Sequence, residues 1–248
     1  MTWRWKVFFD HAEKELSTRL PLEPYPIPEG MREKSAQTGP RAHPTTVVTR
    51  SWAVRSPQIR QARAACVEAE PAPQVLNLVI SPDPRYDLPF FGADLVTLPG
   101  GHLIAIDLQP ALKRDVAHTE PVWERLKPIF DRWRAQLPDG GPIPEEAEPY
   151  FSNGFLWTRL PLDGSGDRAI EQAVWPAFQE YLQLYIDLLL EATPVDEQRC
   201  EVLRQGQLRY LDYRSEKDPA RGMLSRFYGK EWTEDYICLL YTSDAADE

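Results

Sequence analysis

The sequence contains no apolar run long enough to cross a membrane. A membrane-spanning helix needs about 20 consecutive apolar residues, and charged or polar residues interrupt the apolar stretches of this 248-residue chain well before that length. The N-terminal stretch MTWRWKVFFDHAEKEL comes near, but Lys6, Asp10 and Glu13 interrupt it and no small-residue cleavage site follows. This stretch is therefore typical of an amphipathic helix. We expect a cytoplasmic protein, or a protein of the plastid stroma in a eukaryote.

Residues that bind metals or form disulfides are scarce. The chain has three widely spaced cysteines: Cys66, Cys200 and Cys238. An odd number at such spacing argues against a disulfide framework and against a zinc site, and favours a reducing compartment. The histidines also lack the spacing of metal ligands: His11, His43, His102 and His118. We therefore expect no metal centre.

Motifs for bound cofactors and for nucleophilic catalysis are missing as well. No glycine-rich turn leads from a strand into a helix, as nucleotide- and dinucleotide-binding sites require, because Gly100-Gly101 lies between two strand-like runs. The chain has no GxSxG motif and no cysteine beside a histidine, so hydrolase chemistry is poorly supported. We expect no bound nicotinamide, flavin or nucleotide.

The chain has fewer basic than acidic residues overall, but two segments carry an excess of basic residues. The chain has 28 Lys and Arg against 38 Asp and Glu, a net charge of −10, which makes nucleic acid an unsuitable partner. Residues 1–66 nevertheless carry eleven basic against six acidic residues, and residues 199–230 carry eight against four. These segments are either a solvated surface or a docking site for an acidic protein or an anionic ligand.

The regular elements follow from periodicity. Residues 45–54 and 75–80 are strand-like, residues 59–70 fit a strand or a helix, and residues 155–160 fit a further strand. Helices are expected at 121–136, with Pro128 as a kink or break, at 168–192 and at 196–213. Strands then dominate the first two thirds and helices the last third, which predicts an α+β fold with an antiparallel sheet. We expect one domain over 1–248, with 1–45 as an N-terminal segment that is extended and lacks regular structure over the proline-rich residues 21–46.

The stretch from Tyr86 to Pro110 contains an acid in an unexpected place. Two apolar runs flank Pro99-Gly100-Gly101, which predicts a hairpin, and Asp94 lies within the first run. A carboxylate in such a segment must be neutralised, be paired or face a pocket. Asp94 is therefore either the partner of an arginine or turn, or a pocket acid that donates protons near neutral pH.

A second acid and several cations complete the candidate site. Asp218 occurs in YRSEKDPARGM, where it either forms a simple turn or joins Lys217 and Arg221 in a site that binds an anion and transfers a proton. Arg159 ends an apolar strand, so it either extends to solvent or binds a carboxylate. His102, next to the hairpin turn, is typical of a surface or hydrogen-bonded scaffold residue.

These stretches together resemble the ferredoxin-dependent bilin reductases. The resemblance runs from about residue 45 to 237 and is carried by YDLPFFGADLVTLPGGHLIAIDLQP, PIFDRWRAQLPDGGPIPEEAEPYFSNGFLWTRLPL, YRSEKDPARGML and FYGKEWTEDYI. The second of these stretches favours the phycoerythrobilin-forming branch of the family. Long matches of unusual composition are far more specific than a short motif.

The resemblance implies both a fold and a reaction. The fold is a three-layer α/β/α sandwich with a central antiparallel sheet, and a linear tetrapyrrole lies between the sheet and the C-terminal helices. No cofactor is bound, and reduced ferredoxin is the external electron donor. The implied reaction reduces the A-ring diene of 15,16-dihydrobiliverdin to phycoerythrobilin through bilin radicals. The alternatives are a sister reductase acting on biliverdin and a non-catalytic bilin carrier. The implied partners are ferredoxin and an upstream bilin reductase, and a monomer suffices.

The resemblance also implies residue roles. Asp94 matches the sheet aspartate that contacts the pyrrole nitrogens and donates a proton, and Asp218 matches the helix-side aspartate that protonates the A-ring end. Arg159 resembles the arginine that pairs with a propionate, and Lys217 and Arg221 are weaker candidates for that role. Residues 238–248 leave the family pattern abruptly, and we expect them to be foreign sequence appended to a truncated reading frame.

Overall fold

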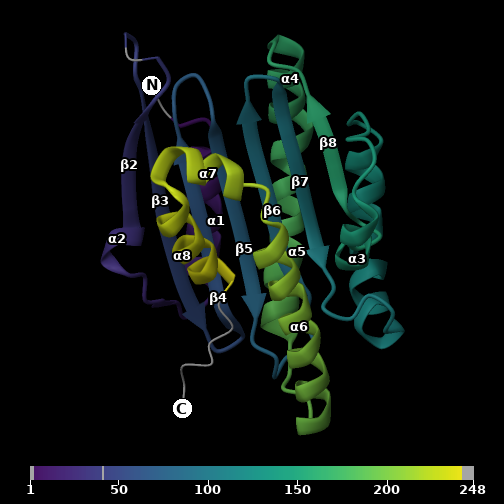
Figure 1. Ribbon diagram of the computed structural model, residues 1–248. Coiled ribbons are helices and arrows are strands. Elements are labelled where there is room, and N and C mark those ends of the chain that lie inside the picture. Colours follow the sequence, from purple (N-terminus) through teal and green to yellow (C-terminus); the bar gives the residue numbers. More distant parts are fainter. Residues whose placement is uncertain (1–2, 41, 242–248) are drawn as a thin grey trace.

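An open antiparallel sheet of eight strands forms the centre of the molecule (Figure 1). The computed structural model describes residues 3–40 and 42–241. The strands follow the order β1-β3-β4-β5-β6-β7-β8, and β2 pairs with β3. Their bounds are β1 (Glu23–Pro24), β2 (Glu33–Thr38), β3 (Thr45–Ser56), β4 (Ile59–Glu68), β5 (Gln74–Pro82), β6 (Phe90–Leu98), β7 (Gly101–Gln109) and β8 (Leu156–Leu160).

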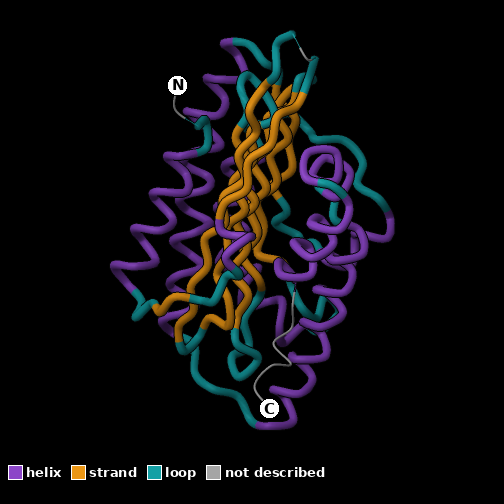
Figure 2. The backbone as a smooth tube through the Cα atoms, turned by 60° about the vertical axis from the view of Figure 1, so that its left-hand side comes forward, coloured by secondary structure: helices purple, strands orange, loops and turns teal. Residues whose placement is uncertain are grey.

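Helices cover both faces of this sheet, as the edge-on view of Figure 2 shows. One layer contains α1 (Lys6–Arg19), α3 (Val116–Arg134) and α5 (Trp175–Glu191), and α5 is preceded by α4 (Gly164–Ala169) and a π-helical turn (Ile170–Val174). The other layer contains α6 (Glu197–Lys217), α7 (Arg221–Tyr228) and α8 (Lys230–Tyr241). Two short elements lie outside these layers: α2 (Glu29–Arg32) and the 3₁₀ helix η1 (Glu145–Tyr150). The α+β class and the three layers are therefore confirmed.

Each face of the sheet packs against one helical layer, because successive side chains of a strand point to opposite faces. In β6, Phe91, Ala93 and Leu95 are buried against the α1–α5 layer, whereas Phe90 packs with the α6–α8 layer. The expected buried stripe of the 168–192 helix is confirmed: Ile170, Val174, Phe178, Tyr181, Leu182, Tyr185 and Leu189 are all buried. The amphipathic N-terminal helix is confirmed as α1.

The structure corrects the expectation for residues 21–46. Residues 33–38 form β2, which pairs with residues 45–50 of β3, so the segment is not without regular structure. The average composition of the segment hid this six-residue run, EKSAQT, which contains neither proline nor glycine. The ambiguous stretch from residue 59 is strand β4, because pairing with strands on both sides outweighs the helix preference of its alanines.

The bounds of two helices differ from those that the sequence indicated: α3 begins at Val116 rather than residue 121 and ends at Arg134 rather than residue 136. Helix α3 continues through Pro128, which faces solvent, where water can bond the carbonyl that proline leaves without a partner. Helix α6 reaches Lys217 rather than residue 213. Within the described residues, no helix is long and apolar enough to cross a bilayer. Of the expected foreign tail, residues 238–241 end α8, and residues 242–248 lie outside the described residues.

Candidate active site

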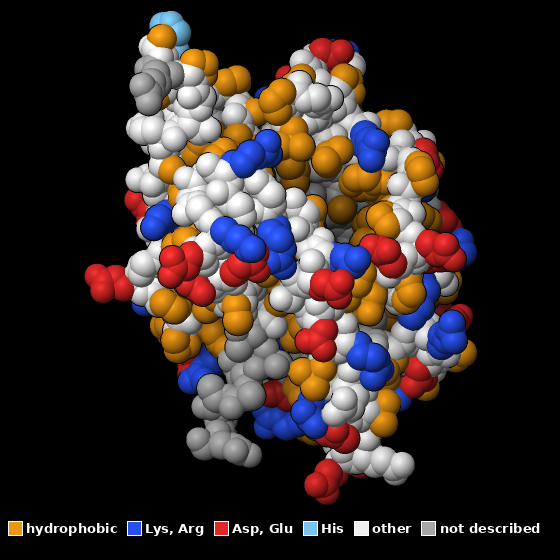
Figure 3. All heavy atoms as spheres, in the orientation of Figure 1, with side chains coloured by type: hydrophobic (Ala, Val, Ile, Leu, Met, Phe, Trp, Pro, Cys, Tyr) orange, Lys and Arg blue, Asp and Glu red, His pale blue; other side chains and the backbone are white. Residues whose placement is uncertain are grey.

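The helices leave part of one face of the sheet uncovered at β6, β7 and β8. Cross-strand register places Asp94 opposite Ala105, which in turn lies opposite Trp157. The next row contains Val96, Leu103 and Arg159. These six side chains are partly or fully exposed, whereas their neighbours along the strands are buried against the α1–α5 layer. Figure 3 shows a hollow lined with hydrophobic side chains over this part of the molecule.

Asp94 lies in a polar setting on this face. Asn77 on β5 donates a hydrogen bond to Asp94 Oδ1, and Arg63 on β4 donates to Asn77 Oδ1 at 2.6 Å. Arg214 Nη2 on α6 lies 3.5 Å from Asp94 Oδ2, and the Asp94 side chain is 33% exposed. Phe91, which precedes Asp94 in the sequence, points to the opposite face. Of the two readings that the sequence left open, the structure therefore supports pairing: Asp94 lies beside an arginine at the edge of the hydrophobic hollow.

Helix α6 brings the second predicted acid to the same arginine. Asp218 follows the last turn of α6, four residues after Arg214, so both occupy one side of the helix. Its Oδ1 accepts from the Ala220 amide, and its Oδ2 accepts from the Tyr241 hydroxyl at 2.7 Å. That hydroxyl also accepts from Arg214 at 3.3 Å. Tyr241 belongs to the tail that leaves the family pattern, and its hydroxyl is the group that links Asp218 to Arg214 by hydrogen bonds.

The charge of Arg214 is strongly supported by this arrangement. Burial acts to lower the pKa of Arg214, but its neighbours raise that pKa well above the usual value: Tyr241, Tyr210, Asp94 and Asp218. Its side chain is only 14% exposed. A fixed cation between two carboxylates can stabilise the negative charge that each acid acquires when it gives up a proton.

The three predicted anion-binding residues differ in their surroundings. Arg159 is exposed on the face that carries Asp94, with its guanidinium 5.4 Å from the centre of the Trp157 ring. Lys217 lies 3.3 Å from Glu146 of η1, and Arg221 forms an ion pair with Glu234. Of these cations, Arg159 is the best placed to meet an anion in the hollow.

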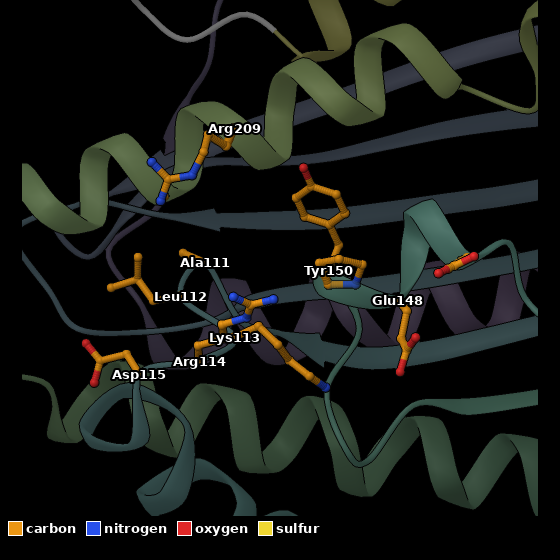
Figure 4. A pocket seen from close by; sticks show the side chains of 11 residues that line it. Ala111, Leu112, Lys113, Arg114, Asp115, Glu148, Tyr150 and Arg209 are labelled. Atoms are coloured by element: carbon orange, nitrogen blue, oxygen red, sulfur yellow. The ribbon is translucent and has the colours of Figure 1, made fainter.

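Aromatic contacts join η1 to α6 at one end of the site. Tyr150 stacks on Tyr213 with ring centres 4.3 Å apart, and Tyr210 packs on Phe90 of β6 at 4.2 Å. Beyond Tyr150 lies an open cleft of about 950 Å³ between α6, η1 and the loop after β7 (Figure 4). Its lining residues are Ala111, Leu112, Lys113, Arg114, Asp115, Glu145, Glu148, Pro149, Tyr150, Gly206 and Arg209. Neither Asp94 nor Asp218 is among the residues that line this cleft.

Polar residues are also buried in β7, among them Asp107 and His102. Burial raises the pKa of Asp107 to about 6, although Asp107 accepts hydrogen bonds from the amide and the hydroxyl of Ser152. His102 is fully buried, and its Nδ1 lies 3.0 Å from the Thr97 hydroxyl. His102 is therefore a hydrogen-bonded scaffold residue, and it faces away from the hollow. Within residues 3–40 and 42–241, no group of His, Cys, Asp and Glu is arranged to bind a metal.

Sequence reasoning missed Arg63, Asn77 and Arg214. A signal was present for Asn77, a polar residue within the apolar run VLNLVI, but not for Arg63, because β4 contains several other polar residues. Their pairing with Asp94 depends on the register between β4, β5 and β6. Arg214 carried no such signal, since charged residues are common on helices.

The chain belongs to the ferredoxin-dependent bilin reductase family, whose family model matches residues 9–240. This match confirms the resemblance that the sequence indicated. The chain is therefore an oxidoreductase that reduces a bilin with electrons from ferredoxin.

The relatives named phycoerythrobilin:ferredoxin oxidoreductase are highly similar to this chain. The one from Parasynechococcus marenigrum (strain WH8102) is 60% identical over 95% of this chain and 89% of its own length. The one from Synechococcus sp. (strain WH8020) is 58% identical over 95% of this chain and 91% of its own length. A crystal structure of tomato phytochromobilin synthase in complex with biliverdin superposes with a TM-score of 0.85 at 26% identity, covering 96% of this chain and 82% of that one.

Proposed function

We propose that this protein reduces the A-ring diene of 15,16-dihydrobiliverdin to phycoerythrobilin, with Asp94 and Asp218 as proton donors. The observation that supports this proposal is the convergence of the two acids near Arg214: Asp94 of β6 lies 3.5 Å from its guanidinium, and Asp218 at the end of α6 is linked to it through the Tyr241 hydroxyl. The two relatives that are 60% and 58% identical to this chain are named for phycoerythrobilin, the product of this reaction. An upstream reductase that forms 15,16-dihydrobiliverdin would supply the substrate.

The reaction balances with these groups. Two ferredoxins deliver one electron each, and two protons complete the addition of two hydrogens to the diene, so the bilin passes through a radical after the first electron. Asp94 supplies one proton from the sheet side, and Asp218 supplies the other at the A-ring end. Each acid is left as a carboxylate beside the Arg214 guanidinium, which offsets the new charge until solvent restores the proton.

Ferredoxin docks on the open side of the site in this proposal. Many cations of residues 1–66 are paired with acids, as Arg19 is with Asp187, so this segment is less positive on the surface than in the sequence. Lys and Arg side chains gather over α7 beside the hollow (Figure 3). Arg226 and Lys230 lie in and just after α7. An acidic ferredoxin would be steered to this rim, within reach of the bilin.

An anaerobic assay with reduced ferredoxin tests the proposed reaction. The protein is given 15,16-dihydrobiliverdin or biliverdin, the absorbance is followed, and the products are separated by chromatography. We expect phycoerythrobilin from 15,16-dihydrobiliverdin and no turnover of biliverdin. Turnover of biliverdin would instead assign a sister reaction, and tight binding without reduction of either bilin would assign a carrier.

A further inference from the structure

Trp157 lies in the same cross-strand row as Asp94. Ala105 is the residue between them, and its single methyl group leaves the sheet surface low at that point. Two strand spacings separate Asp94 from Trp157, or about 10 Å. A tetrapyrrole centred over Asp94 therefore has one side directed at the indole, which stands on the edge strand β8.

The indole is held rigidly on three sides. Its Nε1 donates to the Gly141 carbonyl at 3.1 Å, and a Cβ at Gly140 would overlap the five-membered ring. Phe155 is parallel to it, with an interplanar angle of 5° and ring centres 6.2 Å apart, and Arg159 lies 5.4 Å from its ring centre. Between these contacts the Trp157 side chain remains partly exposed.

We propose that Trp157 is the end wall of the bilin site and a positioning residue for the reaction. This inference rests on the proposed function. A pyrrole ring that carries a propionate packs against the indole, and its propionate reaches Arg159, two residues further along β8. The A-ring end is then directed to the opposite side of Asp94, where α6 presents Asp218. The wall thereby decides which part of the conjugated system meets the second proton donor.

The arrangement around Trp157 favours this role over simple protection of a sheet edge. Edge strands are usually protected by charges, bulges or covering segments, and none of these needs a fixed aromatic ring on the inner face of the strand. Here residues 140 and 141 fit closely around one side of the indole, while the side chain remains partly exposed towards the hollow. A preorganised group of this kind lowers the entropy cost of positioning a ligand.

Substitution of Trp157 tests the inference. Trp157→Ala and Trp157→Phe are compared with Trp123→Ala, a matched control in α3 whose ring also has a cation, Lys127, 5.9 Å from its centre. Bilin affinity is measured by absorbance titration, kcat and KM anaerobically with reduced ferredoxin, and the products by chromatography. Trp157→Leu replaces the alanine variant if that variant does not fold.

We expect Trp157→Ala to raise KM and the bilin dissociation constant by on the order of tenfold. We also expect bilins reduced elsewhere than on the A-ring to appear among the products. Trp157→Phe should restore most of the affinity and the product, and Trp123→Ala should match the wild type. If Trp157→Ala is less stable but keeps the wild-type KM and product, the inference about Trp157 is wrong and the proposed function still stands. Absence of bilin binding by the wild type would overturn both the proposed function and this inference.

Discussion

Replacement of Asp94 by asparagine separates the chemical role of this acid from its structural one. Asparagine has nearly the same shape, and its Oδ1 can still accept the hydrogen bond from Asn77. The change removes the negative charge 3.5 Å from Arg214 Nη2. At an effective dielectric constant near 20, that separation corresponds to an attraction of about 5 kcal/mol. Because the Asp94 side chain is 33% exposed, solvation offsets most of this energy, and we expect a net loss of stability of about 1 kcal/mol.

In free-energy terms, the loss of activity that we expect for Asp94→Asn is much larger than its loss of stability. A positioned proton donor accelerates a reaction by about 10²- to 10⁴-fold, which is about 3 to 5 kcal/mol of barrier. We therefore expect Asp94→Asn to bind bilin and to accept an electron from ferredoxin, but to form product at least about 100-fold more slowly. A bilin radical should accumulate, which electron paramagnetic resonance detects.

Three measurements on the same samples test this reasoning. Urea unfolding gives the stability, absorbance titration gives the bilin affinity, and an anaerobic single turnover gives the rate. Asp212→Asn is the matched control, because Asp212 is exposed on the helix that carries Arg214. Product formation at the wild-type rate by Asp94→Asn would remove Asp94 from the mechanism. A loss of bilin binding equal to the loss of rate would show a binding role in place of proton donation.

Three further predictions concern separate parts of the structure. Asp218→Asn should keep bilin binding and slow product formation by about 10²- to 10⁴-fold in single turnovers, and an unchanged rate would exclude Asp218 as a donor. For Asp107, the folded pKa of about 6 exceeds the usual 3.8, so between these values only the unfolded chain loses its proton as the pH rises. The unfolding free energy of the wild type relative to Asp107→Asn should therefore fall by up to about 3 kcal/mol from pH 4 to pH 7, and a constant difference in urea titrations would contradict this. Gly140→Ala should lower the unfolding free energy by about 1 to 3 kcal/mol because the new methyl overlaps Trp157, whereas Gly222→Ala, with open space around it, should not.

Local patterns allowed much of the fold to be predicted. The buried stripe of α5 repeats with the period of a helix, and the β6–β7 hairpin follows from two apolar runs around Gly100-Gly101. Strand β2 was missed because its neighbours in the sequence are rich in proline. Its pairing partner, β3, begins at Thr45, so the two strands form a local hairpin, but the polar run EKSAQT lacks the apolar alternation by which a strand is recognised.

Part of the candidate site was also predictable from local patterns in the sequence. Asp94 was noticed because an acid is unusual in an apolar run, and pairing with an arginine was one of its two readings, but the sequence did not indicate which residues are its partners. Alternation along β6 places Phe91 and Leu95 on one face of the sheet and Asp94 on the other, so neighbours in sequence are not neighbours in space. The actual partners, Asn77 and Arg214, come from β5 and α6.

The sequence by itself indicated the class of protein, the two candidate acids and an external electron donor. Those conclusions depend on residue types, on their spacing and on the resemblance to a family, all of which can be read along the chain. Only the tertiary structure decided that Asp94 lies beside Arg214, that Asp218 is linked to this arginine through the Tyr241 hydroxyl, and that Ala105 and Trp157 continue the row of Asp94. Strand register and helix docking are determined by packing between distant segments, and this packing also leaves the sheet face open where the site lies.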